Sequence, residues 1–415
     1  MTETCWKIAF VLPSMPGGGL EVSMLRIASY LKKTGHQVSM LTTEEPGAWF
    51  ERVEATGLSA LHVEGLNQGF PHAHARRVGR MLRDGRFDII FPVFDRFSQA
   101  ALGMLPDSAI VIPLLRNDHP DTYEIGLANS CNWNVAVANS PKNAEAAKGL
   151  VPHRPVLLIP NGVEPPQNVA SRSISVPSLR LLFVGRLVHE SKGVLLLPDI
   201  LMGAAERGID CTLTIAGDGV DREELERRFE QRGLKNKVTF TGMVGRDEVF
   251  SLFSLSHILL FTSFYEGLPN AVLEAQAQGC IPIATLLPGV TDFVVINGET
   301  GYLVAPNDVL GFVGSIEKIY KDREQASKMA DKAANFMKEE FSNEREGNRY
   351  LTLIEQAMDG QYPLTHPRSM SPCLDSNLFP KNYICEKRKT IIKRHLPGWL
   401  LHAFRGMKRL THSAR

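Results

Sequence analysis

Glu266 and Glu274 lie on either side of a predicted helix start, where acidic side chains can bind the hydroxyls of a sugar. The segment EGLPNAVLE contains Pro269, which suits the first turn of a helix. The free amides and the dipole of that turn favour a phosphate. Glu274 lies about two turns further on, roughly on the same face, so one carboxylate can bind a sugar hydroxyl and the other a ribose diol. Two solvated glutamates are an equally good interpretation of the pair alone.

Two cations precede these glutamates in the chain. Arg186 follows a predicted strand in the segment Gly185-Arg186-Leu187, and Lys192 comes six residues later. Positive charges in a loop at strand ends suit the stabilisation of a departing diphosphate, for which Arg supplies a planar fork and Lys a point charge. Either residue alone would be interpreted as a surface cation. Beside the glutamate motif, the two together favour a diphosphate site.

A framework of parallel strands and helices must position these residues. A buried strand at 7–12, a glycine-rich loop at 13–19 and a helix over 20–33 form the first strand–loop–helix cycle. The same cycle restarts at 179, after a segment rich in Pro and Ser. In such sheets ligands bind at the carboxyl ends of the strands, so we expect a site in the cleft between two doubly wound α/β domains.

The length of 415 residues also favours two domains. The expected units are an N-terminal Rossmann-like domain that binds the acceptor, a C-terminal Rossmann-like domain that binds the donor, and a helix that packs back toward the first domain. In order along the chain, the expected parts are the N-terminal domain at 1–165, a linker at 166–178, the C-terminal domain at 179–340, the final helix at 341–360, an irregular linker at 361–380 and a basic tail at 381–415.

The order of the motifs resembles that of the retaining glycosyltransferases of family 4. GRL…KG, AGDG, YEGLPNAVLEAQAQG and ETGYLV follow one another, and the Glu-x₇-Glu element is the hallmark of that family. The resemblance implies the GT-B fold. It also implies transfer of a sugar from a nucleotide-sugar, such as a UDP- or GDP-sugar, to a glycan or lipid-linked acceptor in cell-envelope or exopolysaccharide biosynthesis.

The resemblance implies a role for each matching residue. Arg186 and Lys192 match the cations that contact the donor diphosphate, Glu266 matches the acid that faces the transferred sugar, and Glu274 matches the residue that binds the ribose. The other expected donor-binding residues are those of the glycine loop (Gly18, Gly19), those beside the base (Met243, Val244) and a backbone stretch around sugar and phosphate (Leu268, Pro269, Asn270, Ala271, Val272).

The implied reaction retains the anomeric configuration and uses no protein nucleophile of the kind found in retaining hydrolases. It requires held geometry and a stabilised leaving group. The chain has no Asp-x-Asp pair, the usual metal–nucleotide element of the other large glycosyltransferase fold. Cations and helix amides take the place of a metal, so we expect metal independence and no cofactor.

His119, in the segment LLRNDHPD, is the fourth expected catalytic residue. Many relatives have a histidine near the reacting sugar at this point, but a loop histidine with a polar neighbour is an equally good interpretation. Arg116 and Asn117 resemble a subset of relatives that act on exopolysaccharide or lipopolysaccharide intermediates, so the division of roles is open. A second departure, at 287–292, replaces the usual Gly-Gly…Pro-Glu and leaves the donor sugar open.

The composition excludes several other classes. A formal net charge of +1 gives no case for a nucleic-acid partner. The six cysteines form no C-x-x-C pair and match no zinc module. No apolar run approaches the length of a membrane span, and the N-terminus lacks a signal-peptide pattern, so we expect a cytoplasmic protein.

The last 35 residues differ from the rest of the chain. Residues 381–415 contain ten Lys and Arg and one Glu, a formal charge of +9, which leaves −8 on the remainder. An apolar stripe with basic residues opposite is typical of an interfacial helix at an anionic membrane, although a packed helix or a disordered end is an equally good interpretation. The candidate membrane-contacting residues are Trp399, Leu400, Phe404, Arg405, Lys408 and Arg409.

A second basic feature recurs at helical spacing in Arg76, Arg80 and Arg83. The solvated face of a helix is the slightly favoured interpretation, and a patch for anionic lipid or a phosphorylated acceptor is the alternative. With the tail, this feature makes peripheral attachment to the inner face of the cytoplasmic membrane an expectation to test.

Two other functions were weighed against sugar transfer. Nucleotide-sugar epimerases share the GT-B fold but lack the Glu-x₇-Glu arrangement. A non-catalytic nucleotide-sugar-binding protein is disfavoured by the complete set of Arg186, Lys192, Glu266 and Glu274.

Overall fold

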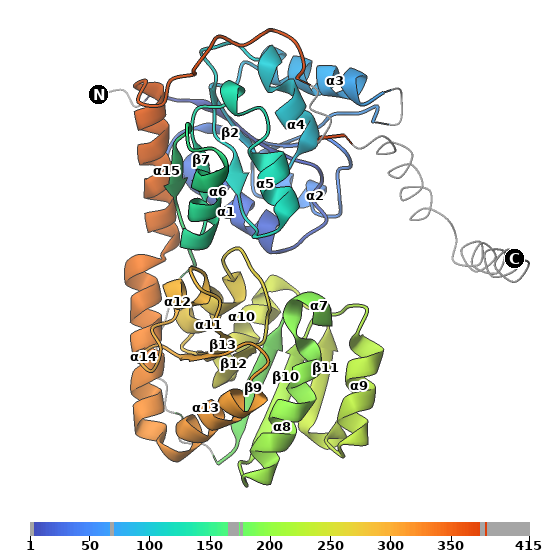
Figure 1. Ribbon diagram of the computed structural model, residues 1–415, viewed down its shortest axis with the longest axis vertical. Helices are drawn as coiled ribbons and strands as arrows, with labels where there is room; N and C mark the ends of the chain where they lie inside the picture. Colours follow the sequence, from blue (N-terminus) through green and yellow to red (C-terminus); the bar gives the residue numbers. More distant parts are fainter. Residues whose placement is uncertain (1–3, 67–69, 165–173, 175–176, 374–377, 380–415) are drawn as a thin grey trace, which may run out of the picture.

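The buried apolar runs of the sequence form the parallel strands of two stacked α/β domains, the upper and lower halves of Figure 1. The computed structural model describes residues 4–66, 70–164, 174, 177–373 and 378–379. Within them the expected class, two doubly wound α/β domains, is confirmed. The candidate membrane-contacting residues of the tail, from Trp399 to Arg409, lie outside the described residues.

The N-terminal domain has a five-stranded parallel sheet in the order β3-β2-β1-β4-β5 and a three-stranded parallel sheet in the order β6-β7-β8. The strands are β1 Lys7–Leu12, β2 Gln37–Thr42, β3 Ser59–His62, β4 Ile89–Pro92, β5 Ile110–Val111, β6 Leu114–Leu115, β7 Ala136–Ala138 and β8 Val156–Leu158. The helices are α1 Gly19–Lys33, α2 Phe50–Ala55, α3 Pro71–Asp84, α4 Arg96–Ala101, α5 Pro120–Gly126 and α6 Pro141–Leu150, with short 3₁₀ turns at Leu102–Met104 and Ser130–Asn132.

The sequence predicts one strand over 109–114, and the structure divides it into β5 and β6. Pro113 lies between them and has no N–H to donate to a strand ladder. Its carbonyl instead accepts a hydrogen bond from Val137 N–H at 2.9 Å, which begins the pairing with β7. The proline therefore moves the chain from one sheet to the next.

The C-terminal domain has a six-stranded parallel sheet in the order β11-β10-β9-β12-β13-β14. Its strands are β9 Leu179–Val184, β10 Cys211–Ala216, β11 Val238–Gly242, β12 Ile258–Phe261, β13 Ile281–Thr285 and β14 Tyr302–Val304. Its helices are α7 His189–Lys192, α8 Leu197–Glu206, α9 Arg222–Gln231, α10 Arg246–Leu255, α11 Asn270–Ala277, α12 Thr291–Val294, α13 Val309–Lys321 and α14 Arg323–Glu340, with 3₁₀ turns at Val194–Leu196 and Lys235–Lys237.

Helix α15, Asn343–Met358, returns to the N-terminal domain and packs against α1 (Figure 1). Gly347 permits this approach, because a Cβ at that position would lie 2.2 Å from the ring of Tyr30. Where the chain crosses back, Val163 N–H donates to Phe341 O at 2.6 Å and Asn343 N–H donates to Val163 O at 3.1 Å. The outgoing and returning crossings are thus bonded side by side.

After α15, residues 361–373 and 378–379 form no helix or strand, yet they pack on the N-terminal domain. We call these described residues the strap. Arg368 is buried in that domain, where its guanidinium donates to the carbonyls of Pro106, Ala109 and Asn132. Burial lowers the pKa of Arg368 to about 10. The strap is therefore a fastened segment, whereas the sequence predicts an irregular linker.

None of the helices in the described ranges has the length and apolar character that a membrane crossing requires.

Candidate functional site

The first turn of α11 presents unpaired amides at the end of strand β12. The N–H groups of Asn270 and Ala271 donate to no protein atom within the described residues. The side chains of Leu268 and Val272 are buried in the core of the domain, so a donor at this turn can meet only their backbone. With Pro269 as the N-cap, this helix start is suited to bind a phosphate.

Lys192 and Glu266, 74 positions apart in the sequence, form an ion pair beside this turn. Their side chains are 19% and 17% exposed. The Ser263 hydroxyl also donates to the Glu266 carboxylate, at 3.0 Å. The end of α7 is fixed against β12, because Thr262 Oγ1 donates to Lys192 O at 2.7 Å. The structure thus brings together two of the four predicted catalytic residues and holds their backbones.

Arg186 follows β9 and is exposed, and within the described chain it makes no hydrogen bond or ion pair. Its loop packs closely on the AGDG motif. A Cβ on Gly217 would lie 1.9 Å from Gly185 O, and a Cβ on Gly219 would lie 2.4 Å from Leu187 O. The glycines are therefore required by the close approach of two loops, and this packing leaves the guanidinium of Arg186 free for an anion.

Glu274 lies on α11 and is partly buried, and it forms no hydrogen bond or ion pair with any described residue. Burial raises the pKa of its carboxyl group, while the charges of Arg246 and Arg26 act in the opposite direction. Arg26 belongs to α1 of the other domain. A carboxylate without a partner between two arginines is free to accept hydrogen bonds from a diol.

The glycine loop meets α11 across the boundary between the domains. Gly18 is the N-cap of α1 and Gly19 its first residue. Asn270 Nδ2 donates to Gly19 O at 3.1 Å, and Asn161 Nδ2 donates to Asn270 Oδ1 at 2.8 Å. The side chain of Asn270 therefore joins the two domains, while its backbone N–H stays free.

Arg116 continues this chain of bonds into the N-terminal domain. Its guanidinium donates to Asn161 Oδ1 at 2.5 Å and to the hydroxyl of Tyr350 on α15. Glu346, also on α15, lies 3.9 Å from Arg116 and accepts a hydrogen bond from Arg26 at 2.8 Å. We call Arg26, Arg116, Asn161, Glu346 and Tyr350 the boundary network. Sequence analysis missed the roles of all five, since no local pattern links residues up to 320 positions apart.

His119 is placed at the start of α5, where it is the N-cap residue. Its Nδ1 accepts a hydrogen bond from Asp121 N–H at 3.3 Å, and its side chain is about half exposed. This local contact fits a loop histidine with a polar neighbour. The structure brings Arg116, rather than His119, against the donor-side motif, because a Cβ on Gly267 would lie 2.3 Å from Arg116 O.

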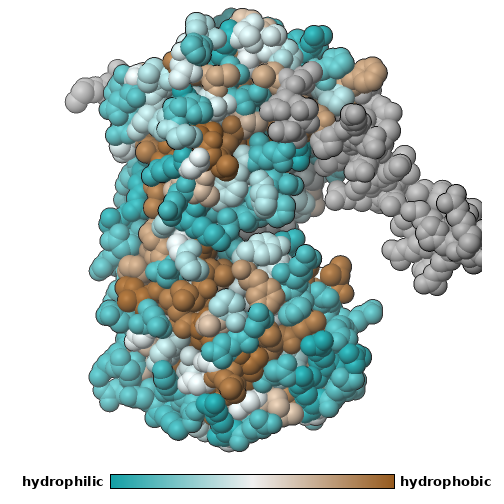
Figure 2. Space-filling view, viewed as in Figure 1, coloured by the Kyte–Doolittle hydropathy of each residue, from teal (hydrophilic) through white to brown (hydrophobic). Residues whose placement is uncertain are grey.

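Met243 and Val244 lie in the loop between β11 and α10. Met243 is 74% exposed. The loop borders the AGDG motif, since Gly217 N–H donates to Gly242 O at 2.8 Å. The segment 287–292 lies at the domain boundary as well, where Lys142 N–H donates to Gly289 O at 3.2 Å. Figure 2 shows the surface hollowed between the two domains, at the right of the view.

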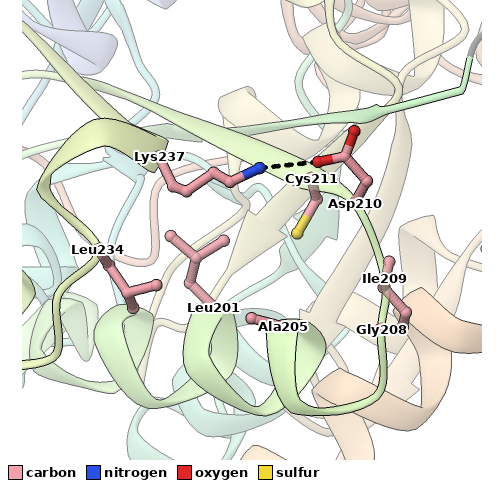
Figure 3. Close-up of a pocket in the computed structure, with 8 residues that line it drawn as sticks. All are labelled: Leu201, Ala205, Gly208, Ile209, Asp210, Cys211, Leu234 and Lys237. Atoms are coloured by element: carbon pink, nitrogen blue, oxygen red, sulfur yellow. Dashed lines mark hydrogen bonds and ion pairs between the residues drawn. The ribbon is translucent and has the colours of Figure 1, made fainter.

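A cavity of about 230 Å³ in the C-terminal domain lies away from this site. Figure 3 shows its lining, with Lys237 and Asp210 paired across it at 2.8 Å. It includes the first residue of β10, at the amino ends of the strands, whereas Arg186 and Glu266 follow carboxyl ends. Burial raises the pKa of the Cys211 thiol in this cavity to about 11, so that thiol is not a reactive group.

Replacing Gly267 with alanine is expected to lower sugar transfer about 10²-fold. The added Cβ cannot fit against the carbonyl of Arg116, so the two sides of the site must move apart. Steady-state rates with varied donor will measure the effect. Gly149→Ala is the matched control, because nothing lies within 4 Å of a Cβ at that position on α6. A Gly267→Ala enzyme within twofold of the wild-type rate would contradict the assigned boundary contact.

Comparison with known proteins gives two family matches. The model "Glycosyl transferases group 1" matches residues 168–336, and "Glycosyltransferase Family 4" matches residues 17–166. Alpha-D-kanosaminyltransferase of Streptomyces kanamyceticus is 31% identical over 176 residues, which are 42% of this chain and 45% of that one. This chain therefore aligns with less than half of that relative.

Two further matches extend over most of the chain. A Campylobacter jejuni N-acetyl-D-galactosaminyltransferase, named for an undecaprenol-linked acceptor, is 23% identical over 364 residues, 84% of this chain and 98% of that one. The crystal structure of Anabaena HepE in complex with UDP-glucose has a TM-score of 0.70 at 18% identity, and it covers 85% of this chain and 100% of that one. The structural match supports the GT-B fold.

Proposed function

Because the chain belongs to the group 1 glycosyltransferases, we propose that it transfers a sugar from a nucleotide-sugar to a glycan or lipid-linked acceptor, retaining the anomeric configuration and using no metal. The observation that carries the proposal is the paired Lys192 and Glu266 beside the free amides of Asn270 and Ala271. The family assignment leaves the epimerase and the non-catalytic alternatives without support.

In the proposed reaction, the acceptor hydroxyl attacks the anomeric carbon on the face from which the diphosphate leaves. The bond from that carbon to the diphosphate oxygen breaks, and the hydroxyl proton passes to the departing diphosphate. Arg186, Lys192 and the amides of α11 stabilise the charge on that group. Glu266 faces the transferred sugar, Glu274 binds the ribose, and the loop at Met243 and Val244 lies beside the base.

The relatives support a glycan or lipid-linked acceptor of the cell envelope. The Campylobacter enzyme is named for an undecaprenol-linked glycan, and a Rhizobium meliloti relative, 28% identical over 236 residues, is named for lipopolysaccharide core biosynthesis. We extend this class of acceptor to the present chain. An acceptor of this kind suits an enzyme at the inner face of the cytoplasmic membrane.

A thermal-shift screen with nucleoside diphosphates and nucleotide-sugars tests the donor half of the proposal. A ligand at one hundred times its Kd should stabilise the folded protein by about 2.7 kcal/mol. The true donor and its diphosphate should stand out from the others, and the same donor should then support transfer. The proposal fails if no nucleotide stabilises the protein and none supports transfer.

Transfer is expected to continue at an unchanged rate in excess EDTA. Cations and helix amides contact the leaving diphosphate in the proposed reaction, so removal of divalent metal costs nothing at that step. Rates with and without EDTA, measured with the donor found in the screen, check this. Activity abolished by EDTA and restored by manganese would overturn metal independence.

A further inference from the structure

The strap ends at a defined place on the N-terminal domain. Cys373 N–H donates to Ala100 O at 2.8 Å, and a Cβ on Gly103 would lie 2.4 Å from Ser371 O, so the strap lies directly against the end of α4. Leu378 is fully buried in the core of that domain. The described chain therefore ends held in the domain beside α4, where it appears as a red segment in Figure 1.

The last two described residues connect this end to α3. Leu378 O accepts a hydrogen bond from Arg96 Nη1 at 2.8 Å. The ring of Phe379 lies 5.1 Å from that of Phe97 on α4, and the other neighbour of Phe97 is His74 of α3, at 4.6 Å. One aromatic ring thus separates the point where the basic tail begins from helix α3.

The outer face of α3 is basic. Its inner face buries His74, Val78 and Leu82. Arg76 and Arg80 are exposed and form no hydrogen bond or ion pair with any described residue. Phe70, which precedes the helix, is 71% exposed. Figure 2 shows a mainly hydrophilic surface in this part of the molecule, at the upper right.

We propose that the outer face of α3 and residues 381–415 form a single docking surface for an anionic membrane. The inference rests on the proposed function, for which the acceptor is lipid-linked. Two basic features 300 positions apart in the sequence are brought to one side of the molecule by the strap. An exposed aromatic ring beside free arginines suits the boundary of lipid headgroups and acyl chains.

The charge distribution favours this one orientation. Residues 1–380 carry a formal charge of −8, so most faces of the enzyme are repelled by an anionic surface. The tail carries +9, and the arginines of α3 lie beside its origin. Attraction is therefore concentrated on the α3 side, and the N-terminal domain, which is the acceptor domain of the proposed reaction, faces the membrane.

Co-sedimentation with phosphatidylglycerol–phosphatidylcholine vesicles tests the surface. The full-length variant Arg76→Gln/Arg80→Gln should bind about 25-fold more weakly than wild type, about fivefold for each arginine. The matched control is Lys148→Gln/Lys338→Gln, which removes two exposed, unpaired lysines from α6 and α14. The control should stay within twofold of wild type. Equal effects in both variants would show a net-charge effect and overturn the proposal.

A second measurement locates the surface without a substitution. In hydrogen exchange of the vesicle-bound protein, peptides from 70–84 should be slowed, while peptides from α14 should be unchanged. Deletion of 381–415 should weaken vesicle binding as well. The proposal is overturned if exchange in 70–84 is unaffected, if neutral vesicles bind equally, or if a DNA duplex competes as strongly as the anionic vesicles.

Donor binding separates this inference from the function on which it rests. The α3 variant and the tail deletion should keep the thermal shift given by the nucleotide-sugar donor. Lost vesicle binding with an intact donor shift supports the docking surface. Unchanged vesicle binding with an intact shift refutes the surface alone. Absence of any donor shift in the wild-type protein refutes the proposed function.

Discussion

Replacing Arg186 with alanine is expected to reduce single-turnover sugar transfer by about 10²–10³-fold without loss of stability. The guanidinium is exposed and bonds to no described residue, so its removal leaves no buried group unpaired. Its charge acts on the diphosphate as negative charge develops there, where one positioned donor is worth about 3–4 kcal/mol. Rapid-quench measurement at saturating donor isolates this step from donor binding.

The control for this variant is Arg207→Ala in the same domain. Arg207 pairs with Glu317 on the surface at 2.6 Å, and such exposed pairs contribute little. Its transfer rate should equal that of wild type. Glu266→Gln and Lys192→Ala should also be impaired, and their double variant should lose less than the two single losses combined, because these side chains contact each other. Wild-type rates in all three single variants would refute the site.

Replacing Glu346 with alanine is expected to lower the free energy of unfolding by about 3–5 kcal/mol. The Glu346 side chain is 1% exposed, and its partners Arg26 and Arg116 are 8% and 6% exposed. Without the carboxylate, two buried guanidinium groups lose their counter-charge, which is the costly way to break a buried ion pair. Urea unfolding followed by circular dichroism measures the change.

Glu344→Ala is the matched control, since Glu344 is an exposed glutamate in the first turn of the same helix. It should cost less than about 1 kcal/mol, through the helix dipole alone. The Glu346 variant should also raise the KM for the donor, because Arg116 binds Asn161 and Asn161 binds Asn270 at the start of α11. A loss of stability no larger than that of the control would contradict the boundary network.

Local patterns accounted for most of the fold. Buried apolar runs such as those at β1 and β9, each followed by a glycine loop and a helix, predicted two doubly wound domains. The pattern failed at 109–114, where Pro113 divides one expected strand into two. The segment after α15 has a composition typical of a linker, and composition does not show that Arg368 and Leu378 are buried in the N-terminal domain.

The sequence by itself determined the chemistry of the donor site, because Arg186, Lys192, Glu266 and Glu274 belong to motifs whose residues are close in the chain or follow strand ends of one sheet. Only the tertiary structure decided which groups are paired. It paired Lys192 with Glu266, left Arg186 and Glu274 without protein partners, and gave His119 a local capping contact.

The tertiary structure also decided what joins the domains and where the basic tail begins. Asn161 meets Asn270, and Arg26 meets Glu346, across 109 and 320 positions of chain. Periodicity reports which face of an element is buried, and it carries no information about which distant element covers that face. Such pairings follow from the packing of whole domains, so they became visible only in the folded chain.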